Sequence, residues 1–208
     1  MTKNNLLSEQ LNYNGDSQTP THLHLCSYNT AQVEKSRIEN AEDLERSLKK
    51  EHINWVQVHG LQNTTVIRQV CELFGIDFLT TQDILNINHL TKIEEHDNYN
   101  VIIIKLLSRD KDGGYTPQHL GVVQGENFLI TFTEQETDFF NEILSALDKN
   151  VLKIRNRQTD YLLSVILNSV MASFMSILTT MEDELDDLEE RFLSSDSYEA
   201  VSYTHLTL

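Results

Sequence analysis

The 208-residue chain contains few of the residues that mark disordered or nucleic-acid-binding proteins. Its 7 glycines and 2 prolines are too few for a linker-rich or disordered chain. The 16 basic residues are outnumbered by 32 acidic ones, and the net charge of −16 argues against non-specific binding to DNA or RNA, which needs clustered lysine and arginine. We therefore expect a folded, acidic protein made of one domain with an appendage, or of one large domain.

Cysteine and long apolar runs are also scarce. Cys26 and Cys71 form no CxxC pair, which excludes a disulfide framework and a thiolate metal site and favours a reducing compartment. The polar N-terminus, residues 1–18, lacks the apolar segment of a signal peptide. The apolar run 101–107 contains Lys105 and is far shorter than the roughly 20 residues that span a bilayer. The chain is therefore predicted to be soluble.

Signatures of catalysis and of metal binding are absent or weak. The sequence has no GxGxxG, GxxxxGK[ST], GxSxG or HExxH motif, so an enzyme is the weakest hypothesis. His22 and His24 have no carboxylate near them in the sequence, and Cys71 lies on an apolar helical face, which favours structural roles. Residues 94–97 (EEHD) are rich in oxygen ligands, but strand alternation sends neighbours to opposite faces, which favours a charge cluster at a turn.

Hydropathy patterns predict a chain of alternating strands and helices. Strands are predicted where apolar and polar residues alternate or where short apolar runs occur: 23–27, 53–58, 92–96, 100–107, 118–124 and 127–133. Apolar residues at helical spacing predict helices over 41–48, 64–74 (with Gly75 after it), 81–85 and from 138 onward.

The strand pattern predicts the fold class. Residues 101–104 are apolar on both faces, which is typical of a central strand covered by helices on both sides. Turns at Asp112-Gly113-Gly114 and at Gly125-Glu126 make the last strands antiparallel neighbours. We predict an α/β (α+β) fold: a disordered head (1–20), an α/β/α sandwich with a mixed, largely antiparallel sheet (21–150), and a long projecting helical segment (151–208).

The long helix is predicted from about residue 158 to 194. Its apolar stripe advances in steps of three and four: Leu163, Leu167, Val170, Phe174, Ile177, Met181, Leu185, Leu188 and Phe192. A helix of roughly 35 residues is about 50 Å long, so we expect it to pack on a partner helix or subunit. Residues 182–190 hold seven acids, and like charges at i and i+4 destabilise a helix. We expect these carboxylates either to lie on a solvated face or to be neutralised by divalent cations or a basic partner.

Several separated motifs resemble the cytoplasmic domain of the CorA family of magnesium and divalent-cation transporters. They are Phe74-Gly75-Ile76, Asp83-Ile84-Leu85-Asn86, Lys92-Ile93-Glu94-Glu95, Trp55, Asp160-Tyr161-Leu162-Leu163 and the acidic run 182–193. The motifs stand in the family's order and cover residues 53–193. The resemblance implies an α/β/α funnel domain of a homopentamer at the cytoplasmic face of the cell membrane. The family's two membrane helices do not appear in this sequence. We therefore interpret the chain as a truncated, soluble part of such a protein, which would be attached to the membrane only through those missing helices.

The resemblance also implies a regulatory Mg²⁺ site between subunits. Asp83 matches the family's aspartate of the DILN helix, whereas Gln82 and Asn168 stand at positions of a second site that are often acidic, which weakens that site. The implied function is sensing of intracellular Mg²⁺ to gate a pore, with Co²⁺, Ni²⁺ or Zn²⁺ as alternative ions of the full-length protein. From the residues alone, Asp83 could instead be an acid near a helix N-terminus. The competing function is a metal-independent interaction module that docks through the long helix.

Overall fold

The computed structural model describes residues 10–109 and 114–194, and the chain divides into two compact units, Met1–Ser169 and Val170–Leu208. Among the described residues, the first unit holds every strand and every helix up to the first turns of the last helix. The described part of the second unit is the continuation of that last helix. Everything that positions a candidate site in the α/β region therefore belongs to the first unit.

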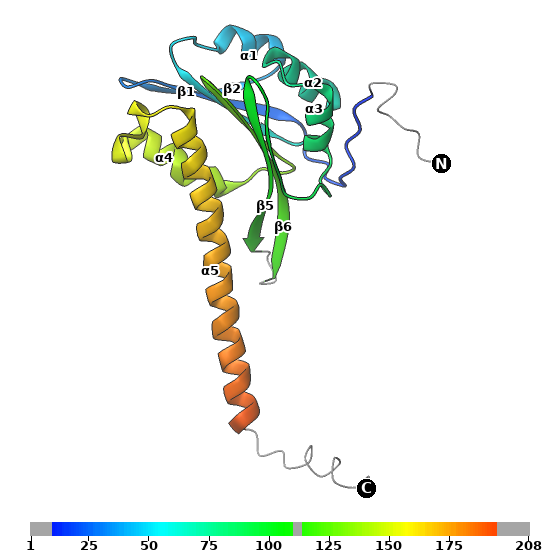
Figure 1. Ribbon diagram of the computed structural model, residues 1–208, viewed down its shortest axis with the longest axis vertical. Coiled ribbons are helices and arrows are strands. Elements are labelled where there is room, and N and C mark those ends of the chain that lie inside the picture. The colour runs from blue at the N-terminus through cyan, green and yellow to red at the C-terminus, as the bar shows by residue number, and fades with distance from the viewer. Residues whose placement is uncertain (1–9, 110–113, 195–208) are drawn as a thin grey trace. The chain divides into compact units, whose positions relative to one another are not determined.

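A seven-stranded mixed sheet forms the middle of the first unit (Figure 1). Its spatial order is β2-β1-β3-β7-β6-β5-β4, and every neighbouring pair is antiparallel except β3 and β7, which are parallel. This confirms the predicted mixed, largely antiparallel sheet. The strands are β1 (His22–Tyr28), β2 (Val33–Ile38), β3 (Ile53–His59), β4 (Lys92–Glu95), β5 (Tyr99–Arg109), β6 (Tyr115–Gly125) and β7 (Phe128–Thr133).

Helices cover both faces of the sheet (Figure 1). One face carries α1 (Ala41–Ser47), α2 (Thr64–Leu73) and α3 (Phe78–Leu85). The other face carries α4 (Asn141–Lys149), preceded by the 3₁₀ turn η2 (Asp138–Phe140) and followed by η3 (Val151–Asn156) and by the first turns, up to Ser169, of α5 (Thr159–Ser194). The predicted α/β/α layering is confirmed.

Each sheet face has its own apolar core. On the first, Leu44, Ile67 and Ile84 of the three helices are fully buried in one cluster with strand residues such as Val56 and Phe132. This cluster removes enough apolar surface from water to hold the helices on the sheet.

On the second face, Trp55 is fully buried and meets Phe140 edge to face, with ring centroids 5.4 Å apart. Its indole Nε1 donates a hydrogen bond to Thr131 Oγ1 at 3.2 Å, which satisfies its polar group inside the core.

Cys71 and Cys26 are buried thiols, and burial raises the pKa of each to about 12. The prediction that Cys71 fills the core is confirmed.

The helices of the first face begin at side-chain caps. Asn40, Asn63 and Asp77 each accept a hydrogen bond from a backbone N–H of the first turn of α1, α2 and α3. The Asp77 cap starts α3 at Phe78, three residues before the predicted start. Asp83 therefore lies in the last turns of α3, and the interpretation of Asp83 as an acid near a helix N-terminus is wrong.

Two elements escaped the sequence analysis. Half of the residues of strand β2 (VEKSRI) are charged, because it is an edge of the sheet and only Ile38 is buried. The 3₁₀ segment η3 contains residues with positive φ, which no periodicity signals. The turn residues Asp112 and Gly113 lie outside the described residues.

The predicted disordered head is partly wrong. Residues 10–20 have no regular secondary structure, yet they contact the α/β region. The backbone N–H of Asn12 donates to Gln82 Oε1 at 2.9 Å and Gln82 Nε2 donates back to Asn12 O at 2.8 Å. The Tyr13 hydroxyl donates to the carboxylate of Glu134. Composition missed these bonds because polar residues of an extended segment carry no periodic signal.

The long helix α5 is confirmed, with a corrected apolar face. In the first unit, Leu162 and Ile166 are fully buried, whereas the predicted Leu163 and Leu167 are only half-buried. In the second unit, large apolar side chains are exposed at heptad-like spacing: Met171, Met175, Leu178, Met181, Leu185, Leu188, Phe192 and Leu193.

By length and composition alone, α5 could also cross a membrane. Its Thr159–Leu193 segment contains an 18-residue window with mean hydropathy 1.9, of which 22% is buried. The sequence analysis missed this window because serine and asparagine interrupt its apolar runs without adding charge. A helix of this kind is by itself weak evidence for a membrane span, since core helices of soluble proteins share its composition.

Two glycines with positive φ form a matched test of backbone strain and crowding. Gly75, at φ 68°, has no atom within 4 Å of an added Cβ, whereas Gly60, at φ 78°, would place a Cβ 2.5 Å from Thr19 O. We expect Gly75→Ala to lower the free energy of unfolding by about 1 kcal/mol from strain alone. Gly60→Ala should lower the free energy of unfolding by roughly 1–3 kcal/mol more than Gly75→Ala does, because its Cβ would also be crowded. Urea unfolding measures both; equal losses would contradict the crowding at Gly60.

Stability should also depend on pH through two buried histidines. Burial lowers the pKa of His59 and of His119 to about 4, helped by His22 and His24 at the first and by Lys105 at the second. Since histidine in an unfolded chain titrates near pH 6.5, the unfolded state binds more protons below that pH. Stability is therefore lost as the pH falls from about 6.5 to about 4, by roughly 1.4 kcal/mol per pH unit and group.

The pH prediction is tested by urea unfolding of wild type and His119→Gln at neutral pH and near pH 5. The variant should lose less stability on acidification, by about 2 kcal/mol, because one of the two histidines no longer takes up a proton. An unchanged pH slope would show that folding does not lower the pKa of His119.

Candidate functional site

The candidate metal residue Asp83 lies where α3 turns toward β4. Its side chain is 29% exposed, and its Oδ2 accepts a hydrogen bond from Lys92 Nζ at 2.7 Å. His89 Nε2, on the turn between the two elements, lies 3.5 Å from Asp83 Oδ1. The predicted carboxylate is therefore available at the surface, but a cation of the same chain already faces it.

Lys92 links Asp83 to a second carboxylate. Its Nζ also lies 2.5 Å from Glu94 Oε2, because Lys92 and Glu94 point to the same side of β4. The hydrogen bond to Asp83, followed by that to Glu94, raises the pKa of Lys92, and the bond from Lys92 lowers the pKa of Glu94. Lys92 thus neutralises part of the charge that a divalent ion would otherwise meet.

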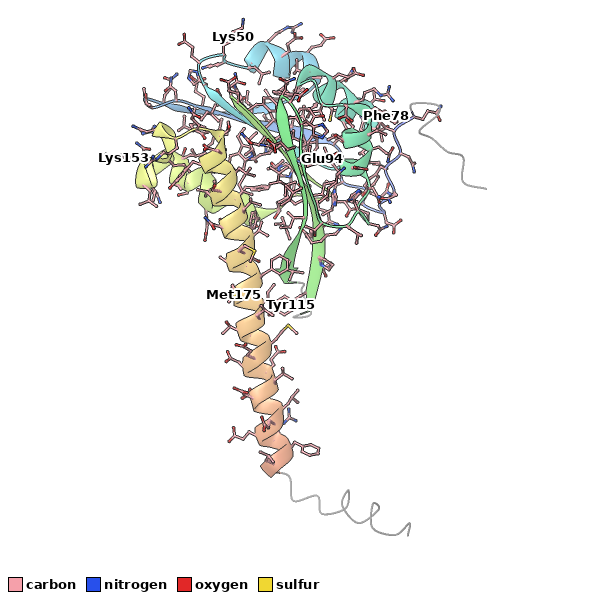
Figure 2. The ribbon with its side chains drawn as sticks, viewed as in Figure 1. Lys50, Phe78, Glu94, Tyr115, Lys153 and Met175 are labelled. Carbon is pink, nitrogen blue, oxygen red and sulfur yellow. The ribbon has the colours of Figure 1, made fainter. Side chains whose placement is uncertain are left out.

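The charge cluster continues to the start of α3. His96 Nε2 lies 3.6 Å from Glu94 Oε2, and its Nδ1 lies 3.7 Å from Asp77 Oδ2. The Tyr99 hydroxyl donates to the same Asp77 oxygen at 2.6 Å, while its ring stacks on His96 with centroids 4.5 Å apart. Figure 2 marks Phe78, the first residue of α3, and Glu94 on β4. Within residues 94–97, Glu94 and His96 are members of a surface charge cluster.

The other two predicted site residues, Gln82 and Asn168, are not grouped with further candidate metal ligands among the described residues. Gln82 is engaged on both its amide atoms by the backbone of Asn12. Asn168 is exposed on α5. Among the residues that the structure describes, no group of three or more His, Cys, Asp or Glu side chains is arranged to hold a metal ion. A complete site for an oxygen-preferring cation would therefore need ligands beyond those of this single chain's described residues.

The acidic run of α5 is solvent-exposed along its whole length, residues 182–190. Exposure to water and ions screens these carboxylates and reduces their mutual repulsion. The structure thus agrees with the solvated-face interpretation of this run, which belongs to the second unit.

The sequence analysis missed one cluster of titratable groups. His22, His24 and His59 lie on adjacent strands with ring centroids 5.2 to 5.6 Å apart. His22 Nε2 is 2.9 Å from Glu136 Oε1, and His59 Nδ1 is 2.8 Å from Thr133 Oγ1. Burial lowers the pKa of His24, with a contribution from His22. Glu136 follows His22 by more than a hundred residues, so only strand pairing could have signalled the contact.

Comparison with known proteins identifies the class of this α/β/α domain with its long C-terminal helix. Residues 50–203 match the family model described as CorA-like Mg²⁺ transporter protein. The cobalt/magnesium transport protein CorA of Thermotoga maritima is 30% identical over 152 residues, covering 73% of this chain and 43% of that protein. CorA of Methanocaldococcus jannaschii is 24% identical over 141 residues, covering 67% and 44%.

The chain therefore belongs to the CorA family. The fold agrees: the structure of the soluble domain of CorA from Methanocaldococcus jannaschii superposes with a TM-score of 0.62 at 19% identity, covering 91% of this chain and 70% of that one. The chain spans less than half the length of the curated relatives it matches.

Lys92 is the residue to change in order to test whether Asp83 can receive a divalent ion. Lys92→Gln removes a positive charge within 3 Å of Asp83 and Glu94, and we expect it to tighten binding of Mn²⁺, used as a Mg²⁺ probe, by roughly tenfold. Electron paramagnetic resonance of free Mn²⁺ measures the change. The matched control is Lys35→Gln, which breaks a similar exposed pair with Asp148 at 2.6 Å. Equal effects of the two variants would show that only net charge matters.

Proposed function

We propose that this chain is the soluble, cation-sensing part of a CorA-type magnesium or divalent-cation transporter. The family match over residues 50–203 is the observation that carries the proposal. The named relatives are cobalt/magnesium transport proteins, which favours Mg²⁺ as the sensed ion, with Co²⁺, Ni²⁺ or Zn²⁺ as further ions of a longer protein. The proposed location is the cytoplasmic face of the cell membrane.

The proposed sensing element is Asp83, placed at a boundary between subunits of a homo-oligomer. Its carboxylate is partly exposed, and its own chain offers it only Lys92 and His89 as close ionic partners among the described residues. A hard divalent cation prefers carboxylate oxygens, so the remaining ligands would come from a neighbouring subunit. Gln82 can add only an amide oxygen and would first have to release Asn12.

Electrostatic repulsion would drive the response. Each chain carries a net charge of −16, so subunits in a ring repel one another unless cations screen their facing carboxylates. A bound divalent ion supplies that screening. Without it, Asp83 returns to Lys92, the subunits separate, and the gate of a pore attached to the ring would follow.

A second candidate function rests on the exposed apolar side chains of the second unit. Met171, Leu178, Leu185 and Phe192 recur every seven residues and are each about half or more exposed. This spacing is typical of a seam that packs on another helix. The alternative is therefore a metal-independent interaction module that docks through α5.

Light scattering of the 208-residue chain in EDTA and across a millimolar Mg²⁺ series separates the two candidates. Sensing through Asp83 predicts a Mg²⁺-promoted increase in mass toward a pentamer, which Asp83→Asn should shift to roughly tenfold higher Mg²⁺ because one charged ligand is lost. The matched control is Asp148→Asn, an exposed acid that also pairs with a lysine.

The outcomes assign the function. A mass that rises over the same Mg²⁺ range in wild type and Asp148→Asn, but only at roughly tenfold higher Mg²⁺ in Asp83→Asn, supports the sensor. A helix-mediated dimer that ignores Mg²⁺, and that Leu185→Asp disrupts, supports the interaction module. Identical Mg²⁺ responses of all three proteins would remove Asp83 from the mechanism.

A further inference from the structure

A polar cavity of about 700 Å³ lies in the first unit, away from Asp83. It is bounded by the end of β1, the loop after α1, the turn before β7 and the segment that leads into α5. Its volume is in the range of small-molecule sites, and most of its lining side chains are polar. In Figure 2, the label Lys50 marks the loop after α1, and Lys153 marks the segment before α5.

Buried polar atoms without partners concentrate at this cavity. Of the seven buried side-chain atoms that make no hydrogen bond among the described residues, two (His22 Nε2 and His96 Nε2) face carboxylates in ion pairs. Four belong to residues that line the cavity: the Tyr28 hydroxyl, both ring nitrogens of His52, and Arg155 Nε. Tyr28 is only 1% exposed. Each unsatisfied group costs about 1–3 kcal/mol, so a ligand whose hydrogen-bonding groups reach them would be stabilised.

The lining carries a local excess of positive charge in a strongly acidic chain. The basic residues are Lys50, Arg155 and Arg157, and the acidic ones are Glu51 and Glu126. A planar guanidinium offers several N–H donors in a fixed fork, the geometry that phosphate oxygens accept. The net negative charge of the chain repels anions, but these basic side chains attract an anionic ligand locally.

The backbone that carries Arg155 is held in a strained conformation. Asn150, Leu152 and Lys153 all have positive φ, between 51° and 56°. Asn150 is the left-handed C-cap of α4, a conformation that asparagine adopts readily. At Leu152 and Lys153 the same conformation costs of order 1–3 kcal/mol each, and such residues concentrate at binding sites, where the surrounding structure holds them in place.

Two hydrogen bonds, one within this segment and one to the turn between β1 and β2, fix the position of Arg155. Its backbone N–H donates to Asn150 Oδ1 at 3.2 Å, and its Nη1 donates to Ala31 O at 3.4 Å. One guanidinium nitrogen, Nη1, is thereby held in place, while the N–H of Nε makes no hydrogen bond. A preset donor of this kind lowers the entropy cost of binding.

We propose that this cavity binds a phosphate-bearing small molecule of about nucleotide size. Arg155 and Arg157 hold the phosphate, and Tyr28 and His52 donate hydrogen bonds to it or to the group that carries it. The side-chain amides that line the cavity, Asn29 and Asn127 among them, satisfy the polar remainder of the ligand.

Isothermal titration calorimetry of the 208-residue chain with ADP, and separately with inorganic phosphate, tests the proposal. The buffer contains EDTA, so that no divalent ion contributes. We expect ADP to bind with a dissociation constant in the micromolar to millimolar range and to weaken with added salt. Arg155→Gln should weaken binding at least tenfold, and Tyr28→Phe, which removes one hydroxyl, by roughly fivefold.

Lys153→Gln is the matched control, because it removes a positive charge two residues from Arg155 without being among the cavity-lining residues. Circular dichroism verifies the fold of each variant; if Arg155→Gln does not fold, Tyr28→Phe and Arg157→Gln decide. Tighter binding of ADP than of phosphate assigns the site to a nucleotide-like ligand, and equal binding assigns it to the phosphate group alone. No binding of either at millimolar concentration, or an equal loss in Lys153→Gln, overturns the proposal.

Discussion

The parallel pairing of β3 with β7 is the constraint on which the first unit depends. It places the beginnings of both strands, Ile53 and Phe128, at one end of the sheet and their ends, His59 and Thr133, at the other. Because β1 runs antiparallel to β3, Tyr28 finishes beside Ile53. The polar cavity and the histidine cluster therefore form at opposite ends of the same three strands.

A single threonine couples this sheet to the long helix. Thr159, the first residue of α5, donates from Oγ1 to Gly125 O at 2.7 Å and accepts from Gln124 Nε2 at 2.9 Å. The turn between β6 and β7 thus fixes where α5 begins, and with it the arginines just before the helix. A ligand in the cavity would touch the residues from which α5 starts, whereas a cation at Asp83 would act at the end of α3. The two proposed sites rely on different elements of one sheet.

Much of the fold could be predicted from local patterns, and most of the site could not. The strand 101–104 was identifiable as an interior strand because it is apolar on both faces, but it lies next to the edge strand β4 and not at the centre of the sheet. Gly75 was identifiable as a helix end because its left-handed conformation favours glycine. Strand β2 was missed because an exposed edge tolerates charge in place of alternation. Asp83 was found through a family motif, but its pairing with Lys92 depends on how α3 turns into β4.

The sequence by itself determined the layered class of fold, the acidity of the surface and the length of α5, because these follow from periodicity and charge along the chain. Tertiary structure alone decided which residues meet. Glu136 reaches His22, and Asn12 occupies Gln82, across separations that no local pattern encodes. It also decided that Leu162, and not Leu163, enters the core, because a helix's buried face depends on the surface it packs against as much as on its own stripe.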